Sequence, residues 1–181
     1  VNAWMHRLTG GAWGDAIHPV ALALGRRLPW LMLLLLPVVA GLPVLYPWAA
    51  DPQGAWSDGL SRPAFVRLWL TTPFFIVRVA WYAGVWWWLA RPASLARKGR
   101  SAASLIVHAL VTSLAAVDLL ASLLPGWASA GFGLLALAGQ ALSGAALAVW
   151  LAARAGLPEH EPREPGKPPL SRDLGNLLLM W

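Results

Sequence analysis

The sequence lacks cysteine, although the chain is 181 residues long. Without a thiol it can form no disulfide and can hold no iron–sulfur cluster or thiolate metal site of its own. Charged residues are also scarce, at 12% of the chain, which is about half of their share in a soluble domain. So few charges cannot cover a water-soluble globule, and 58% hydrophobic residues excludes a disordered chain.

Sequence motifs of common enzymes are missing as well. There is no phosphate-binding P-loop, no dinucleotide fingerprint, no H-E-x-x-H motif and no nucleophile elbow. A b-type haem usually needs two axial histidines on helices, but His6, His18 and His160 lie outside the long apolar runs. We therefore expect no catalytic residue, no metal site and no cofactor bound by this chain alone.

Four long apolar runs dominate what is present. They are residues 28–50, 73–90, 102–124 and 130–153. A membrane-crossing helix needs roughly 20 residues, and the lipid-facing backbone must satisfy its own hydrogen bonds. The sequence therefore predicts an all-α integral membrane protein with a four-helix transmembrane bundle.

Prolines and small residues mark details of these helices. Pro29 suits the start of the first helix, Pro37 and Pro43 predict kinks, and Pro47 predicts its end. In the fourth run, small residues four apart predict a close helix contact. These are Gly139 and Ser143.

Basic residues predict the orientation of the bundle. Eleven of the 14 lysines and arginines lie before the first run, between the second and third, or after the fourth. Because positive loops stay in the cytoplasm, both ends of the bundle are expected there. The net charge of +6 is then an orientation signal, and no nucleic-acid partner is expected.

The predicted organisation has four parts. Residues 1–27 form an N-terminal amphipathic cytoplasmic segment, 28–157 the bundle, and 158–172 a cytoplasmic loop rich in proline and charge. Residues 173–181 turn apolar again and resemble the start of a fifth span. Ending at Trp181, the chain is expected to be either a fragment or a shortened protein.

Tryptophan is unusually frequent, with 13 residues. An indole ring is amphipathic and favours the membrane–water boundary. We therefore expect interface anchors near the ends of the runs. The candidates are Trp30, Trp48, Trp69, Trp127, Trp150 and the run Trp86 to Trp88.

Two charges lie within the apolar runs, and a charge at membrane depth needs a specific reason. Arg78 is in the second run and Asp118 in the third. Both fall toward the same half of the membrane, so an ion pair between them is geometrically feasible. The two residues either form a purely structural ion pair or take part in moving protons or substrate, and the sequence leaves both alternatives open.

A row of polar residues in the third and fourth runs suggests a proton path. His108 and Asp118 are ten residues apart and project on nearby helix faces. The alternative is that the hydroxyl groups bond to their own backbone. The candidate path comprises Arg78, His108, Thr112, Asp118, Ser122, Gln140 and Ser143.

Four segments in order resemble one protein family. They are 8–14 (LTGGAWG) with 45–48 (LYPW), 72–78 (TPFFIVR), 116–127 (AVDLLASLLPGW) with 132–133 (FG), and 171–178 (SRDLGNLL). Together they resemble the ActF-type membrane subunit of bacterial alternative complex III, a quinol:cytochrome c oxidoreductase. That subunit belongs to the NrfD-like, or polysulfide-reductase membrane-anchor, superfamily.

The resemblance implies a multi-pass subunit of the bacterial inner membrane. Partner subunits would carry haem c and iron–sulfur clusters, a haem-copper oxidase could be attached, and quinone or quinol would be the ligand. The motif positions are Arg78, Asp118 and Asp173, which joins the proton-path candidates. Leu124 and Gly126 stand where the family usually has an acid and a histidine.

Two main functional hypotheses follow. The chain either contributes a proton path or quinone-adjacent surface to a respiratory quinol-oxidising complex, or serves only as a structural and assembly subunit. A small transporter is a third reading, supported only by the proline-rich first run.

Overall fold

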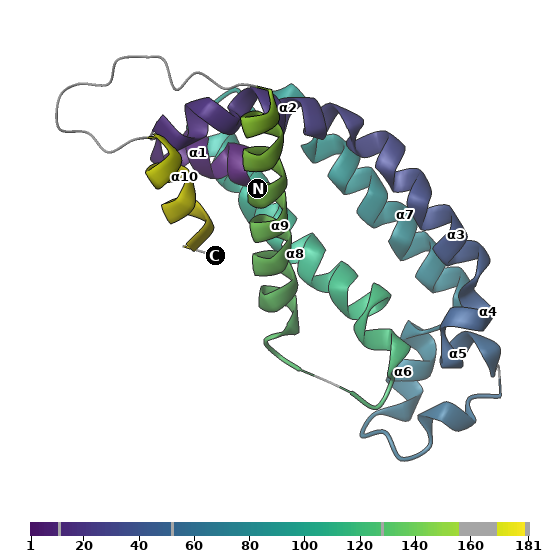
Figure 1. Cartoon of the computed structure of the whole chain (residues 1–181). Coiled ribbons are helices and arrows are strands. Elements are labelled where there is room, and N and C mark those ends of the chain that lie inside the picture. The colour runs from purple at the N-terminus through teal and green to yellow at the C-terminus, as the bar shows by residue number, and fades with distance from the viewer. Residues whose placement is uncertain (11, 52, 128, 156–169, 180–181) are drawn as a thin grey trace. The chain divides into compact units, whose positions relative to one another are not determined.

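The computed structural model is helical and describes residues 1–10, 12–51, 53–127, 129–155 and 170–179 (Figure 1). These residues contain no strand, which confirms the all-α class. Most of the predicted loop 158–172 and the end at Trp181 lie outside them. The helices are α1 (Asn2–Thr9), α2 (Ala12–Leu31), α3 (Leu35–Ala40), α4 (Leu42–Leu45), α5 (Pro47–Ala50), α6 (Pro63–Trp69), α7 (Thr72–Leu89), α8 (Lys98–Leu119), α9 (Phe132–Arg154) and α10 (Leu170–Leu179), with short 3₁₀ turns between some of them.

Three helical segments are long and apolar enough to cross a membrane. They are Ile17–Ala40, Lys98–Leu123 and Phe132–Arg154. The helices α6 and α7 form a fourth candidate when taken together, although the chain bends by 58° between them. The described structure therefore fits a multi-pass membrane protein. The bundle arrangement and the side on which each end lies remain predictions.

The first span differs from its predicted bounds. The apolar helix runs from Ile17 to Ala40, so it begins earlier than residue 28 and ends before residue 50. Pro29 lies inside α2 instead of starting a helix. The backbone tightens into a 3₁₀ turn three residues later, at Met32–Leu34, and this turn leads into α3.

Two later prolines each start a helix of their own. Pro43 and Pro47 stand in the first two positions of α4 and α5. Proline lacks an N–H group, which the first turn of a helix does not need. Tyr46 precedes Pro47 in an extended conformation, because a residue before proline avoids the helical region. The prolines therefore divide residues 42–50 into short helices and do not kink a single one.

The chain folds into two compact units. Unit 1 comprises Val1–Arg27, Ala90–His108 and Leu137–Trp181, and unit 2 comprises Leu28–Leu89 and Ala109–Ala136. In unit 1, the Asn2 amide donates a hydrogen bond to the Ala141 carbonyl at 3.2 Å, and the Trp4 indole donates one to the Ser94 hydroxyl at 3.0 Å. The N-terminal helix α1 is thus tied to α9 and to the turn before α8.

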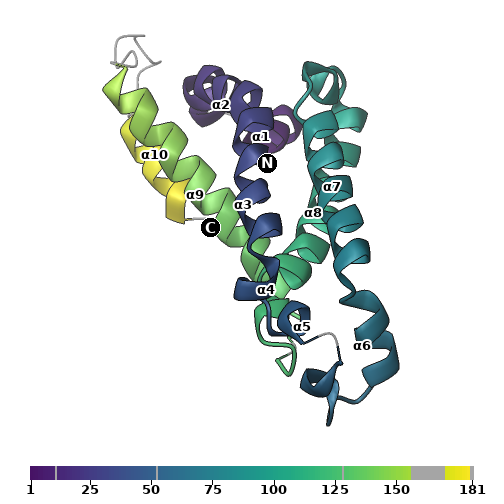
Figure 2. The ribbon, with the colours of Figure 1, turned by 90° about the vertical axis from the view of Figure 1, so that its right-hand side faces the viewer.

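Helix α10 also belongs to unit 1. It lies beside α9 in both views (Figure 1 and Figure 2). Leu174 of α10 packs with Ile17 of α2 and with Ala145 and Ala148 of α9. The residues from 173 onward are helical as far as Leu179, but whether they begin a fifth span stays a prediction.

The close contact on α9 uses a different face from the predicted one. The buried residues are Ala141, Ala145, Ala148 and Ala152. Their spacing of four, three and four places them on one side of the helix. Gly139 and Ser143 are exposed in the described structure, so the predicted small-residue contact is not made there.

Unit 2 has an aromatic core. Its buried residues are Leu42, Tyr46, Trp48, Leu70, Phe75 and Val79. The Phe75 ring centroid lies 5.0 Å from that of Trp48 and 5.4 Å from that of Tyr46. The Tyr46 hydroxyl donates to the Leu119 carbonyl at 2.9 Å, which ties the segment before α5 to α8.

This core corrects one of the predicted membrane anchors. Trp48 is only 3% exposed and belongs to the core. Trp30, Trp127 and Trp150 are exposed, as an anchoring position requires. Being near the end of an apolar run did not distinguish a lipid-facing indole from a core indole.

One glycine permits a close helix approach in unit 2. A Cβ atom on Gly133 of α9 would lie 2.6 Å from Ser113 Cβ and 3.1 Å from Ser113 Cα on α8. We expect Gly133→Ala to destabilise the protein by about 2 kcal/mol, because the helix backbone itself must move. Thermal unfolding in detergent measures the effect.

A second glycine in the same helix provides the control. A Cβ atom on Gly139 would meet nothing within 4 Å. Gly139→Ala should stabilise the helix by about 0.5 kcal/mol, because alanine loses less backbone entropy on folding. Equal shifts for the two variants would contradict the close approach at Gly133.

Candidate functional site

The two charges within the apolar runs form a buried ion pair in unit 2. Arg78 Nε donates to Asp118 Oδ2 at 2.6 Å, and Arg78 Nη2 donates to Asp118 Oδ1 at 3.2 Å. Their side chains are 8% and 1% exposed. The predicted pairing of α7 with α8 through these residues is confirmed.

Two further donors complete the surroundings of the carboxylate. The Trp69 indole donates to Asp118 Oδ1 at 2.8 Å, and the Tyr82 hydroxyl donates to Asp118 Oδ2 at 2.5 Å. Each carboxylate oxygen thus accepts two hydrogen bonds. An ionised carboxylate offers about four acceptor positions, and all of them are used. A proton arriving at Asp118 would therefore have to displace one of these donors.

Arg78 also fills the break between α6 and α7. Its Nη1 donates to the Trp69 carbonyl at 2.8 Å. The last carbonyls of a helix lack a partner within that helix, and the guanidinium supplies one here. The guanidinium carbon lies 4.2 Å from the Trp69 ring centroid and 4.5 Å from that of Phe74. These cation–π contacts and the hydrogen bond hold the bent pair together.

Ser122 does not extend this network as a relay. Its hydroxyl donates to the backbone carbonyl of Asp118, four residues earlier. This is the local bond that serine commonly makes in helices. For Ser122, the geometry therefore matches the alternative in which the hydroxyl group bonds to its own helix backbone.

A second polar contact lies in unit 1. His108 Nε2 on α8 is 2.8 Å from Gln140 Oε1 on α9. An amide oxygen can only accept, so the Nε2 atom of the imidazole donates in this contact. The His108 ring centroid lies 5.4 Å from that of Trp4, so α1 also contacts this histidine.

Buried hydroxyls continue the same face of α8. Ser101 and Ser104 are both buried, seven and four residues before His108. Such spacing places all three on one side of the helix. The Ser101 hydroxyl donates to the Ser94 carbonyl at 3.3 Å. The sequence predicted the polar face of α8 only from His108 toward the C-terminus. Its extension toward the N-terminus of the helix, through Ser104 and Ser101, was missed.

The structure divides the predicted path into two pairs. Arg78 and Asp118 meet in unit 2, and His108 and Gln140 meet in unit 1. Ser143 is exposed on α9. Asp173 lies in α10, but its side chain is outside the described part of the structure. A continuous path through all of these residues stays a prediction.

The sequence interpretation missed two partners of Asp118. Tyr82 follows Arg78 by four residues, a spacing that places both on one face of α7, so helical periodicity could have revealed it. Trp69 was interpreted as an interface anchor. Its partner lies 49 residues later, beyond the break after α6, and no local pattern links the two.

The pair in unit 1 makes a testable contribution to stability. Gln140→Leu should lower the free energy of unfolding by about 1 kcal/mol, because interhelical hydrogen bonds in membranes have that order of magnitude. Ser143→Ala, which removes another exposed polar group of α9, is the matched control and should change it by less than about 0.5 kcal/mol. Chemical unfolding in mixed micelles measures both. Equal losses would mean that the His108–Gln140 contact contributes nothing.

Comparison with known proteins gives no family. The sequence matches no protein-family model and no curated protein. Among the residues that the structure describes, no three histidine, aspartate or glutamate side chains gather closely enough to hold a metal ion. Fold and site define a helical protein that has three or four helices apolar enough to cross a membrane and a buried ion pair between α7 and α8.

Proposed function

We propose that the chain is a membrane subunit of a respiratory quinol-oxidising complex of the alternative complex III type. The supporting observation is that residues 45–48 of the first segment with the family resemblance meet the second and third segments in unit 2. Tyr46 bonds to Leu119, Trp48 packs on Phe75, and Arg78 pairs with Asp118. The motif residues thus form one connected core, as we expect if the motifs have a common structural role.

The exposed apolar helices also favour a subunit role. None of the most apolar window in Ile17–Ala40 is buried, and only 17% of that in Phe132–Arg154 is. Lipid or partner helices must cover such surfaces, because exposed apolar patches of this size are unfavourable in water. In this proposal, the redox cofactors reside in the partner subunits.

Affinity purification tests the proposal. A tagged chain is extracted from its native membranes in a mild detergent, and haem absorbance and quinol:cytochrome c reductase activity are followed across the elution. We expect both to co-elute with the chain. An unrelated tagged multi-pass protein from the same membranes is the control. Elution of the chain without haem-containing partners would refute the proposal.

A purely structural and assembly role is the second candidate. The saturated hydrogen bonding of Asp118 favours it, because a proton carrier must accept and release a proton with little rearrangement. Within a proton-moving complex, His108 is the remaining titratable candidate on α8, and its Nε2 atom lies 2.8 Å from Gln140 Oε1. Activity and assembly of His108→Phe separate the two roles. Loss of proton pumping in an assembled complex favours a path, and unchanged pumping favours the structural role.

A further inference from the structure

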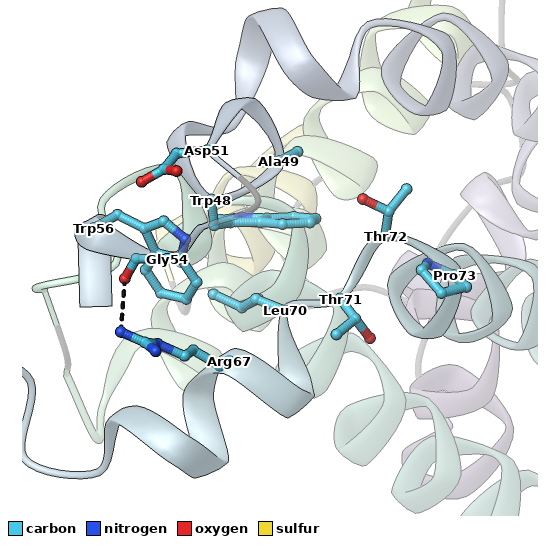
Figure 3. A pocket seen from close by; sticks show the side chains of 10 residues that line it. All are labelled: Trp48, Ala49, Asp51, Gly54, Trp56, Arg67, Leu70, Thr71, Thr72 and Pro73. Carbon is cyan, nitrogen blue, oxygen red and sulfur yellow. Dashed lines mark hydrogen bonds between the residues drawn. The ribbon is translucent and has the colours of Figure 1, made fainter. Parts of the chain in front are cut away.

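A small cavity lies in unit 2 at the start of α7. It has a volume of about 210 Å³ and is bordered by α5, α6, α7 and the segment between α5 and α6 (Figure 3). Its lining includes the rings of Trp48 and Trp56, the Asp51 carboxylate, the Arg67 guanidinium and the Thr72 side chain. The buried ion pair of Arg78 and Asp118 does not line it.

The acceptors around the cavity are already engaged. Asp51 Oδ1 accepts the backbone N–H of Gln53 at 3.0 Å, and Asp51 Oδ2 accepts that of Ala55 at 2.9 Å. The Gly54 carbonyl accepts Arg67 Nη2 at 3.0 Å (Figure 3). These bonds fold the loop around the cavity.

Two hydrogen-bond donors at the cavity, in contrast, have no acceptor among the described residues. Arg67 donates through Nε to Ser57 and through Nη2 to Gly54 and Asp58, but its Nη1 donates to none of the described residues. The indole N–H of Trp48, which is 3% exposed, also lacks an acceptor in the described structure. A guest that supplies acceptor oxygens would satisfy this surplus of donors.

The cavity lining carries one positive side chain, Arg67, and one negative side chain, Asp51, so its formal charge is zero. Asp58, the ionic partner of Arg67, has a side chain that is 76% exposed. Water therefore screens that ion pair strongly, so Asp58 holds Arg67 only weakly. A guanidinium with an unused N–H edge is a preferred binding group for phosphate.

The cavity lies at the depth of lipid headgroups. Helix α7 has 18 residues and is about 27 Å long, close to the thickness of a bilayer hydrocarbon core. Thr72 at one end of α7 therefore stands at the polar boundary. Phe65 and Leu68 of α6 are exposed nearby in the chain, where acyl chains would lie. The volume is also below the usual 300–1,000 Å³ of pockets for drug-sized ligands.

We propose that this cavity binds the phosphate group of a membrane phospholipid, with Arg67 as its main contact and the hydroxyl of Thr72, which also lines the cavity, as a second donor. The apolar surface beside it favours a lipid over free phosphate. The site is independent of any respiratory role of the chain.

Lipid binding to the purified, delipidated full chain tests the proposal. The probes are a short-chain phosphatidylglycerol, the diacylglycerol with the same acyl chains, and inorganic phosphate, with titration calorimetry as the readout. Arg67→Gln should weaken binding of the phospholipid about tenfold, the usual effect of losing one charge-assisted hydrogen bond. Arg62→Gln is the matched control, since Arg62 also belongs to this loop region but does not line the cavity. It should bind like the parent protein, and the diacylglycerol should not bind.

Several outcomes would overturn the proposal. These are undiminished binding by Arg67→Gln, equal binding of the diacylglycerol, and saturation by inorganic phosphate that the phospholipid cannot displace. Arg67 also bonds to its own loop, so circular dichroism must show that Arg67→Gln is folded. If it is not, Thr72→Val decides the question. This variant removes an exposed hydroxyl from the cavity lining, and unchanged binding by it would overturn the proposal.

Discussion

Asp118→Leu is expected to destabilise the protein by about 3–5 kcal/mol, because it leaves the buried guanidinium of Arg78 without its counter-ion. Arg78→Leu should have a similar effect, since it strands the carboxylate. The double variant Arg78→Leu with Asp118→Leu should recover much of the loss, because replacing both charges by apolar groups is often nearly neutral. Unfolding of all four proteins in mixed micelles gives the coupling energy.

The same variants separate the two roles of the site. If the double variant assembles and still supports quinol oxidation and proton pumping, the ion pair is structural. If it assembles but pumping is lost, the pair belongs to a proton path. Asp118→Asn adds a milder change, because it keeps the shape of the side chain and removes only its charge. Additive effects of the two single leucine variants would contradict the coupling that the hydrogen bonds predict.

Phe75→Ala is the second large effect, with an expected loss of about 3–5 kcal/mol. Phe75 is 0% exposed and lies against the rings of Tyr46 and Trp48, so truncation leaves a cavity that these rings cannot fill. The adjacent residue supplies the control. Ile76 is 39% exposed, and Ile76→Ala should destabilise the protein by about 1 kcal/mol or less. Thermal unfolding in detergent compares them, and similar losses would contradict an aromatic core centred on Phe75.

Rare residue types made part of the site predictable. Arg78 and Asp118 are conspicuous because charges within apolar runs are unusual, and pairing is the least costly arrangement for both. The all-helical class followed equally directly from the long apolar runs. Both inferences rest on composition: long apolar runs are typical of segments that lie in lipid, and a charge within such a run is costly unless it is paired.

Other features depend on packing that no local pattern contains. Trp48 and Trp30 both lie near run ends, yet one is in the core and the other is exposed. Gly139 and Ser143 have the spacing of a contact motif, but the described contact uses the alanine face of α9 instead. The choice between such faces is made by the partner surface, here Ile17 and Leu174, which come from distant parts of the sequence.

The bond between Arg78 and Asp118 has a consequence for how the protein enters its membrane. A lone arginine or aspartate opposes insertion of its helix, by about 2.5–3.5 kcal/mol at the helix centre and by less toward the ends, where Arg78 and Asp118 lie. Helix α7 carries the arginine and α8 the aspartate, and only 40 residues separate the two. The insertion machinery would therefore release these helices most readily as a hairpin, with the opposite charges already neutralised. Biogenesis of the two spans is then a single step, and a ribosome stalled between them would leave α7 poorly inserted.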